Sequence, residues 1–167
     1  IAQSGSIGIY GGLVRQAGEI NADSATRDSR GRILLKASQK VELAEESVTR
    51  AVNASGEGGV VQMTGDEIHL QSGARVNASG KTGGEIYVGG GYQGLDASIS
   101  NARQTTVEHG VQLAADATGT GDGGKVIVWS DNATSFYGKI SARGGITEGK
   151  GGLVEVSGKK TLTYDGV

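Results

Sequence analysis

Proline and cysteine are absent from this chain of 167 residues, and aromatic side chains are few: one Trp, one Phe and five Tyr. The lack of cysteine excludes a disulfide framework and thiolate metal sites. No stretch approaches the roughly 20 apolar residues of a membrane helix, so we expect a chain that is not inserted in a membrane. The 16 basic and 18 acidic residues are mixed along the sequence. They form no extended cationic surface, which argues against nucleic acid as a partner.

Glycine, in contrast, is abundant, with 31 residues, and it marks a repeat. Six segments share the form glycine, any residue, apolar, any residue, apolar, and they begin at Gly5, Gly31, Gly59, Gly84, Gly124 and Gly152. The period of two predicts a short strand in each segment. The inward-facing pairs are Ile7/Ile9, Ile33/Leu35, Val61/Met63, Ile86/Val88, Val126/Val128 and Val154/Val156.

A second motif lies upstream of the next glycine, where an apolar residue is followed two positions later by alanine. It occurs as EINAD, AVNAS, RVNAS, QLAAD and KISAR. The phrase VNASG occurs twice, starting at Val52 and Val76, and we interpret the two copies as the same narrow corner of neighbouring coils. Further inward pairs at Val41/Leu43 and Ile68/Leu70 bring the count to about three strands per repeat.

Most of the opening glycines are about 25 to 28 residues apart, a length that three short strands and three turns fill. Each repeat is therefore predicted to form one coil of a parallel β-helix, with equivalent positions stacked about 4.8 Å apart. The fold class expected is therefore all-β, a single solenoid over residues 1–167 with about six coils of about 25 to 28 residues. The wider step from Gly84 to Gly124 leaves about 13 residues over, and residues 89–110 are predicted to project as a loop or hairpin, with a short helical turn in 95–103. Insertions on one face of a solenoid often carry its binding function.

The last third of the chain resembles secreted exoproteins of the filamentous haemagglutinin and high-molecular-weight adhesin type. The specific pieces are VIVWSDN, FYGKISARGG and GGLVEVSG, within residues 121–162. Exoproteins of this type are exported by the two-partner pathway of Gram-negative bacteria and fold as long right-handed parallel β-helices. Because the chain lacks the Asn-Pro motifs of the amino-terminal secretion region, we expect a piece of the shaft or of the region just after that secretion region.

The resemblance also implies a place and partners. It implies a protein that is secreted or held at the bacterial cell surface, with an outer-membrane transporter as the export partner of the full-length chain. It further implies attachment to a host-cell or matrix glycan or protein, or to biofilm polysaccharide. A glycan-binding module and a polysaccharide-active β-helix enzyme are the alternatives.

No motif in the sequence is specific enough to assign a cofactor, a metal site or a catalytic function. The Walker-like GTGDGGKV, residues 119–126, leads into a strand instead of a helix, and Gly89, Gly91 and Gly94 have dinucleotide-site spacing without a βαβ unit. Asp116 and Asp122 lack the repetition of a calcium-binding solenoid. We therefore assign no cofactor, metal or catalytic residue. For an enzyme, the candidate carboxylates are Asp66, Glu67 and Asp131, and we interpret His69 and His109 as solvated surface residues.

Seven side chains remain as candidates, four for ligand contact and three for glycosylation. Exposed aromatic rings can stack on sugars, although packing along a coil edge or against the insertion is the stronger interpretation. Three asparagines lie in glycosylation sequons; two of them are predicted to form a ladder between neighbouring coils, and some adhesins of the resembling type carry sugars there. The aromatic candidates are Tyr10, Tyr87, Tyr92 and Trp129, and the sequon asparagines are Asn53, Asn77 and Asn132.

Overall fold

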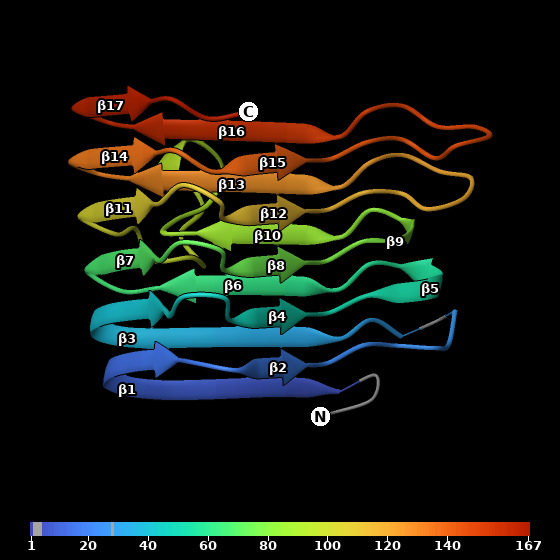
Figure 1. The fold of residues 1–167 in the computed structure, drawn as a ribbon, viewed down its shortest axis with the longest axis horizontal. Coiled ribbons are helices and arrows are strands. Elements are labelled where there is room, and N and C mark those ends of the chain that lie inside the picture. The colour runs from blue at the N-terminus through green and yellow to red at the C-terminus, as the bar shows by residue number, and fades with distance from the viewer. Residues whose placement is uncertain (2–4, 28) are drawn as a thin grey trace.

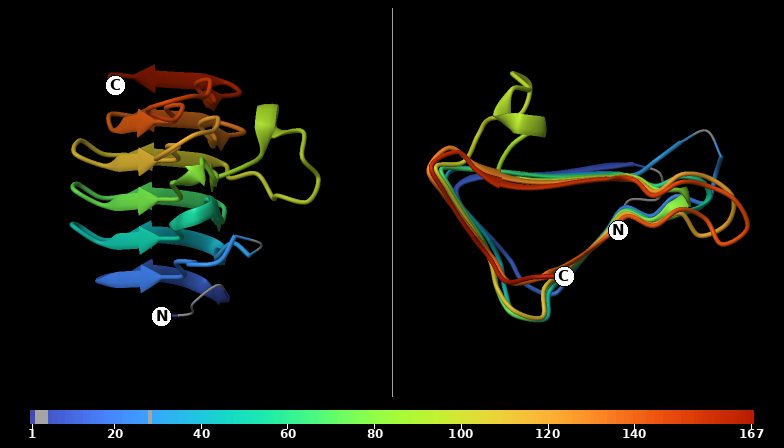
Figure 2. Two further views of the ribbon diagram at one scale, coloured as in Figure 1. Left: turned by 90° about the vertical axis from the view of Figure 1, so that its right-hand side faces the viewer. Right: turned by 90° about the horizontal axis from the view of Figure 1, so that it is seen from above.

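The computed structural model describes residue 1, residues 5–27 and residues 29–167. These residues form a parallel β-helix of about six coils, in which each coil lies directly on the one before it (Figure 1). Seen down the axis, the coils superimpose on a triangular outline with a narrower lobe beyond one corner (Figure 2). The chain turns anticlockwise in that view as it rises toward the viewer, which makes the coil right-handed. The predicted fold class is confirmed.

Each coil has three sides. The first side carries the strands that begin each coil; in the first two coils these continue without a break onto the second side. The third side is formed by short strands, and an additional pair lies in the lobe. The strands are β1 (Ser6–Gln16), β2 (Glu19–Asn21), β3 (Arg32–Leu43), β4 (Val48–Arg50), β5 (Asn53–Glu57), β6 (Val60–Thr64), β7 (Glu67–Leu70), β8 (Arg75–Asn77), β9 (Gly80–Thr82), β10 (Glu85–Val88), β11 (Gln104–Val107), β12 (Gln112–Ala114), β13 (Lys125–Ser130), β14 (Ala133–Phe136), β15 (Lys139–Ser141), β16 (Leu153–Gly158) and β17 (Thr161–Tyr164).

The first side confirms the predicted inward columns. Its strands pair in the order β1-β3-β6-β10-β13-β16, and Ile7 begins a register that continues through Ile33 and Val61 to Val154. The side chains of Ile33, Leu35, Val61, Met63, Ile86, Val88, Val126 and Val128 are fully buried. The core is therefore a stack of aliphatic side chains, and each coil covers the apolar surface of its neighbours.

A narrow waist joins the third side back to the first. There the amide of Gly84 donates to the carbonyl of Ala78 over 2.9 Å, and the same bond joins Gly59 to Ala51 and Gly124 to Ala115. A Cβ atom built on Gly84 would lie 2.2 Å from the carbonyl oxygen of Gly59. Only glycine fits such an approach of two backbones, and this explains why glycine opens each repeat.

The equivalence assigned to the two VNASG phrases is wrong. Strand β4 pairs with β8 so that Thr49 lies beside Val76, and Asn53 lies beside Gly80. One turn of the coil therefore leads from Thr49 to Val76, whereas the shared letters would align Val52 with Val76. The register follows the inward side chains of Thr49, Val76 and Leu113, not the shared letters.

The insertion leaves the rod between β10 and β11 (Figure 2). It covers residues 89–103, because residues 104–107 pair in register with β7 and β14 as part of the coil. Its helical turn is the short 3₁₀ helix η1 (Tyr92–Gly94), earlier than the predicted 95–103. Over the described ranges, no helix has the length and apolar character needed to cross a membrane.

Candidate functional site

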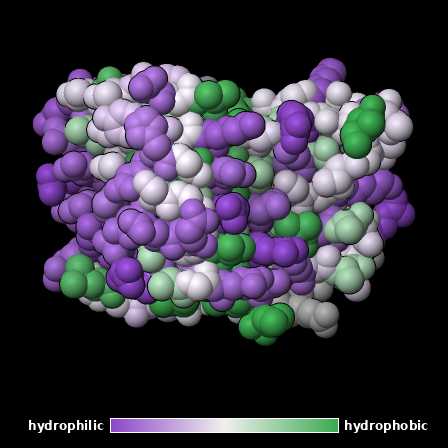
Figure 3. Space-filling view, in the orientation of Figure 1, coloured by the Kyte–Doolittle hydropathy of each residue, from purple (hydrophilic) through white to green (hydrophobic). Residues whose placement is uncertain are grey.

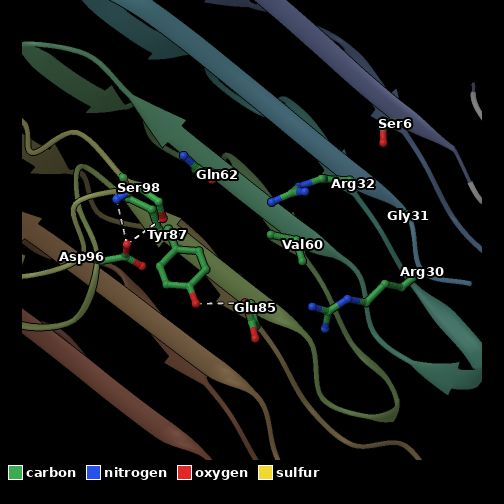
Figure 4. Close-up of a pocket in the computed structure, with 11 residues that line it drawn as sticks. Ser6, Arg30, Gly31, Arg32, Val60, Gln62, Glu85, Tyr87, Asp96 and Ser98 are labelled. Atoms are coloured by element: carbon green, nitrogen blue, oxygen red, sulfur yellow. Dashed lines mark hydrogen bonds between the residues drawn. The ribbon is translucent and has the colours of Figure 1, made fainter.

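A polar groove lies where the insertion overhangs the outer surface of the first side (Figure 4). Its volume is about 430 Å³. The floor is formed by outward-facing side chains of β3, β6 and β10, among them Arg32, Gln62 and Tyr87, and the wall by residues 96–99 of the insertion. A second hollow of about 280 Å³ shares Arg32, Gln62 and Ser98 with the groove and extends it to Tyr10 and Lys36.

One flank of the groove is acidic. The Tyr87 hydroxyl donates to Glu85 Oε2 over 2.9 Å. Burial, followed by this bond to a carboxylate, raises the pKa of Tyr87 far above its usual value. On the insertion, Asp96 Oδ1 accepts hydrogen bonds from the hydroxyl and the amide of Ser98, which lower the pKa of Asp96. Glu85 and Asp96 thus both present carboxylate oxygens to the groove.

The opposite flank is basic. Arg30 and Arg32 reach toward Glu85 and Gln62 from the edge of β3 (Figure 4). Arg30 is paired with Glu57. Arg32 and Lys36, in contrast, have no hydrogen-bond or ion-pair partner within the part of the chain that the structure describes. Two free cations thus lie along one outward row of β3, about 13 Å apart at about 3.3 Å per residue.

The insertion is fixed on the rod by its own small core. Trp129, Tyr87, Ile99, Val60 and Ile127 form a buried cluster under it. The Trp129 indole N–H donates to Asp131 Oδ1 over 3.1 Å, and this oxygen also accepts from the side-chain amide of Asn101. Because side chains from three coils hold the insertion, the groove wall is built into the fold.

The structure divides the four aromatic candidates into two groups. Trp129 and Tyr87 are only 8% and 9% exposed, so neither ring has a free face for a sugar. Tyr10 and Tyr92 are 66% and 48% exposed. Tyr10 lies on an outward position of β1, paired with Lys36 of β3, and it borders the extended groove. Tyr92 lies on η1 near the tip of the insertion.

The sequon asparagines lie in three different settings. Asn53 is fully buried: its amide donates to the carbonyls of Thr26 and Ser29, and its Oδ1 accepts from two backbone amides. Asn77 is half-buried on β8, and Asn132 is half-buried in the turn before β14. Asn53 pairs with Gly80 and Asn77 with Arg50, so the predicted asparagine ladder does not exist. Glycosylation of these residues stays a prediction.

The carboxylates considered for catalysis are each held by a cation or an amide. Asp66 pairs with Arg103 at 3.2 Å and Glu67 with Lys40 at 3.4 Å, while Asp131 is held by the insertion. Among the described residues, no hydrogen bond joins two of these three carboxylates. Their geometry supplies no acid and base pair across a cleft.

The interpretation of the histidines as solvated is wrong for His69. His69 Nε2 lies 2.7 Å from Glu108 Oε1, and the other oxygen of Glu108 accepts from the amide and hydroxyl of Ser72. Burial alone raises the pKa of Glu108, but the bonds from His69 and Ser72 outweigh burial and hold this pKa below its usual value. His109 stacks on Tyr137, with centroids 5.0 Å apart.

The two aspartates weighed for calcium serve as backbone caps between coils. Asp116 Oδ1 accepts from the amide of Arg143, and its Oδ2 pairs with the Arg143 guanidinium at 2.8 Å. Asp122 Oδ1 accepts from the amide of Lys150. Within the described ranges, no three His, Asp or Glu side chains gather closely enough to hold a metal ion.

A further hollow, of about 580 Å³, lies beside β12 and β15 at the end of the rod. Its Asp116 and Arg143 pair with each other, and its floor includes the exposed Val154 of the last coil. Because these two charged groups satisfy each other, we do not interpret the hollow as a binding site. The face that Figure 1 turns to the viewer is otherwise mostly hydrophilic, with hydrophobic side chains in separate spots (Figure 3).

Sequence reasoning did not find the groove under the insertion. Its lining comes from residues as far apart in the sequence as Ser6 and Ile99, and only the coil register brings them together. The insertion itself was the one signal for the location, because it interrupts the regular spacing of the glycines.

Comparison with known proteins agrees with the sequence resemblance. No family model matches the chain, and no curated protein matches it. The crystal structure of the HMW1 secretion domain from Haemophilus influenzae matches with a TM-score of 0.86 and 32% sequence identity. The match covers 99% of this chain and 44% of that one, so the chain spans less than half of its length. The resemblance to secreted adhesins of the high-molecular-weight type is confirmed, and a position in the shaft stays a prediction.

Proposed function

We propose that this β-helix segment serves the export and surface display of a large secreted bacterial adhesin. The observation that supports this most strongly is the likeness to the HMW1 secretion domain, which extends over nearly the whole chain at 32% identity. In this function the full-length protein has an outer-membrane transporter as its partner, and the segment acts as a rigid, stacked scaffold. Its own contribution is mechanical.

Two features of the fold suit such a role. The coils are hydrogen-bonded to their neighbours on the first and second sides, and the first five coils also on the third side, so coils can form one after another as the chain emerges. Apolar side chains also remain exposed at the last coil, among them Leu153, Val154 and Leu162. A further coil stacked on β16 and β17 would cover these side chains in the way that β13 and β14 are covered.

The test is export of the full-length protein by its own transporter. Residues 1–167 are replaced by an unrelated parallel β-helix of the same number of coils, and the protein in the medium and on the cell surface is measured by immunoblot. A role in export predicts that the exported amount falls strongly while the cellular amount persists. If export is unchanged, this segment is not needed for secretion.

Adhesion is measured separately, because it belongs to the same proposal but need not reside in the same residues. The exported wild-type protein is compared with an exported variant in which residues 90–101 are replaced by a short glycine and serine turn. We expect binding to host cells or to biofilm to fall if the insertion contributes to attachment. Unchanged attachment would place the adhesive surface elsewhere in the full-length protein.

A further inference from the structure

We propose that the groove under the insertion binds a carboxylated sugar unit, with Arg32 as the residue that receives the carboxylate. This goes beyond export and display, since it assigns a ligand class and a site to this segment. The site consists of the groove and its extension toward Tyr10, and it is formed by outward residues of β1, β3, β6 and β10 under residues 96–99.

The charges indicate a ligand with a single negative charge. Arg32 and Lys36 are free cations on one flank, whereas Glu85 and Asp96 are carboxylates on the other. A polyanion such as nucleic acid or a heavily sulfated chain would bring charge against these two carboxylates. A single carboxylate can instead lie against the Arg32 guanidinium, which matches its planar geometry in a bidentate hydrogen bond.

The remaining groups suit hydroxyls. Gln62, which has no hydrogen-bond partner for its side chain among the described residues, offers both a donor and an acceptor in the floor of the groove. Glu85 and Asp96 accept hydrogen bonds, and Ser98 lines both hollows. Donors and acceptors that converge on a short groove fit a sugar, whose hydroxyls act as both.

A ring platform lies at the far end. Tyr10 is exposed, and a Cβ atom built on Gly8 would lie 2.6 Å from Tyr10 Cε2, so the ring lies flat over the strand. An aromatic ring with one free face can stack on the apolar face of a pyranose. Gly8 leaves room for this orientation of the ring.

A peptide is the weaker alternative, because strand addition requires a free backbone edge. The floor strands β3, β6 and β10 are each hydrogen-bonded to a neighbour on both sides. Their backbone therefore has no donors or acceptors left for an added strand. Recognition in this groove has to come from side chains.

The test measures binding of the purified chain by isothermal titration calorimetry. The acidic ligands each carry one carboxylate: a disaccharide of glucuronic acid and N-acetylglucosamine and, separately, sialyllactose. The neutral ligands are the disaccharide of N-acetylglucosamine and lactose. We expect at least one acidic ligand to bind and its neutral counterpart to bind about tenfold more weakly or not at all. The better of the two acidic ligands identifies the source of the carboxylate.

The variant Arg32→Gln removes the charge from an exposed side chain and is expected to weaken acidic binding about tenfold, while Arg32→Lys restores part of it. Lys139→Gln, an equal charge change on the third side, is the control and should leave binding unchanged. The urea midpoint of each variant verifies folding. Equal binding of acidic and neutral sugars, binding unaffected by Arg32→Gln, or no binding of either acidic ligand would overturn the proposal. None of these results depends on export.

Discussion

Substitution of Gly84 by alanine is the sharpest perturbation of the waist. The new Cβ atom would lie 2.2 Å from the Gly59 carbonyl oxygen and 2.5 Å from that of Ala78. Carbon atoms pack best about 3.5 Å or more from their neighbours, so the two backbones must separate by about 1 Å. The affected atoms are backbone, and no flexible side chain can move aside.

The cost follows from what this movement disturbs. Overpacking a tight site costs about 1–3 kcal/mol. The Gly84 amide also donates to Ala78, and its carbonyl accepts from Lys125, with bonds of 2.9 and 2.8 Å. Weakening these bonds adds about 0.5–1.5 kcal/mol each. We expect Gly84→Ala to lower the free energy of unfolding by about 3 kcal/mol, a large share of the roughly 5–15 kcal/mol typical of a domain.

Gly119→Ala is the matched control. Like Gly84, it lies outside the strands, but a Cβ atom built on it meets no atom within 4 Å, and its φ lies outside the left-handed region. Because alanine restricts the unfolded chain more than glycine does, we expect the free energy of unfolding to stay the same or to rise by up to about 1 kcal/mol. Urea unfolding followed by the fluorescence of the single Trp, Trp129, measures both variants. Equal effects of the two substitutions would refute the close approach at the waist.

Three further predictions concern the core, the buried sequon and pH. Ile86→Ala should cost about 2–5 kcal/mol in urea unfolding, and Ile86→Val no more than about 1.5 kcal/mol, because the side chain is fully buried; equal costs would contradict the packing. Asn53→Ala should cost about 1–3 kcal/mol through its lost hydrogen bonds. A glycan mapped to Asn53 by peptide mass spectrometry of the folded protein would contradict its burial. The pKa of Glu108 is lowered in the folded state, so its stabilisation is present above the unfolded value of about 4.3 and is lost as the pH falls through the folded value. In Glu108→Gln, the free energy of unfolding should therefore fall less steeply below about pH 4.5 than in the wild type. Glu148→Gln, at an exposed site, is the control and should follow the wild-type profile. Parallel profiles for Glu108→Gln and the wild type would exclude this role for Glu108.

The columns of inward side chains on the first side could be predicted because the same pattern of residue types recurs in every coil. Each inward position is aliphatic or Met, and each strand is preceded by the glycine that the waist requires. Period and composition together therefore indicate the register from Ile7 to Val154. Local signals of this kind suffice where the same short strand recurs.

The third side was predicted less well, because identical letters lie in different environments. Thr49 occupies an inward position where the other coils have Val76 or Leu113, so the pattern of apolar residues breaks there. The VNASG phrase that begins at Val52 lies a few positions later and favoured the wrong alignment. The Thr49 hydroxyl is buried without a hydrogen-bond partner among the described residues, whereas the side chain of Asn53 makes four hydrogen bonds. A hydrophobic pattern encodes neither case.

The groove could not be predicted from the sequence for a different reason. Its cations, carboxylates and hydroxyls come from successive coils, and the insertion completes it from above. The free state of Arg32 and the pairing of Arg30 with Glu57 depend on side-chain directions. Spacing in the sequence carries no information on such partners.

Methyl NOEs on isotopically labelled protein test the coil register most directly. Thr49 and Val76 are buried neighbours on β4 and β8, whereas Val52 lies opposite Ser79. The register of the structure predicts strong cross-peaks between the Thr49 and Val76 methyl groups. Cross-peaks between Val52 and Val76 in their place would mean a shorter coil, and the waist, the core columns and the groove would then be assembled from the wrong residues.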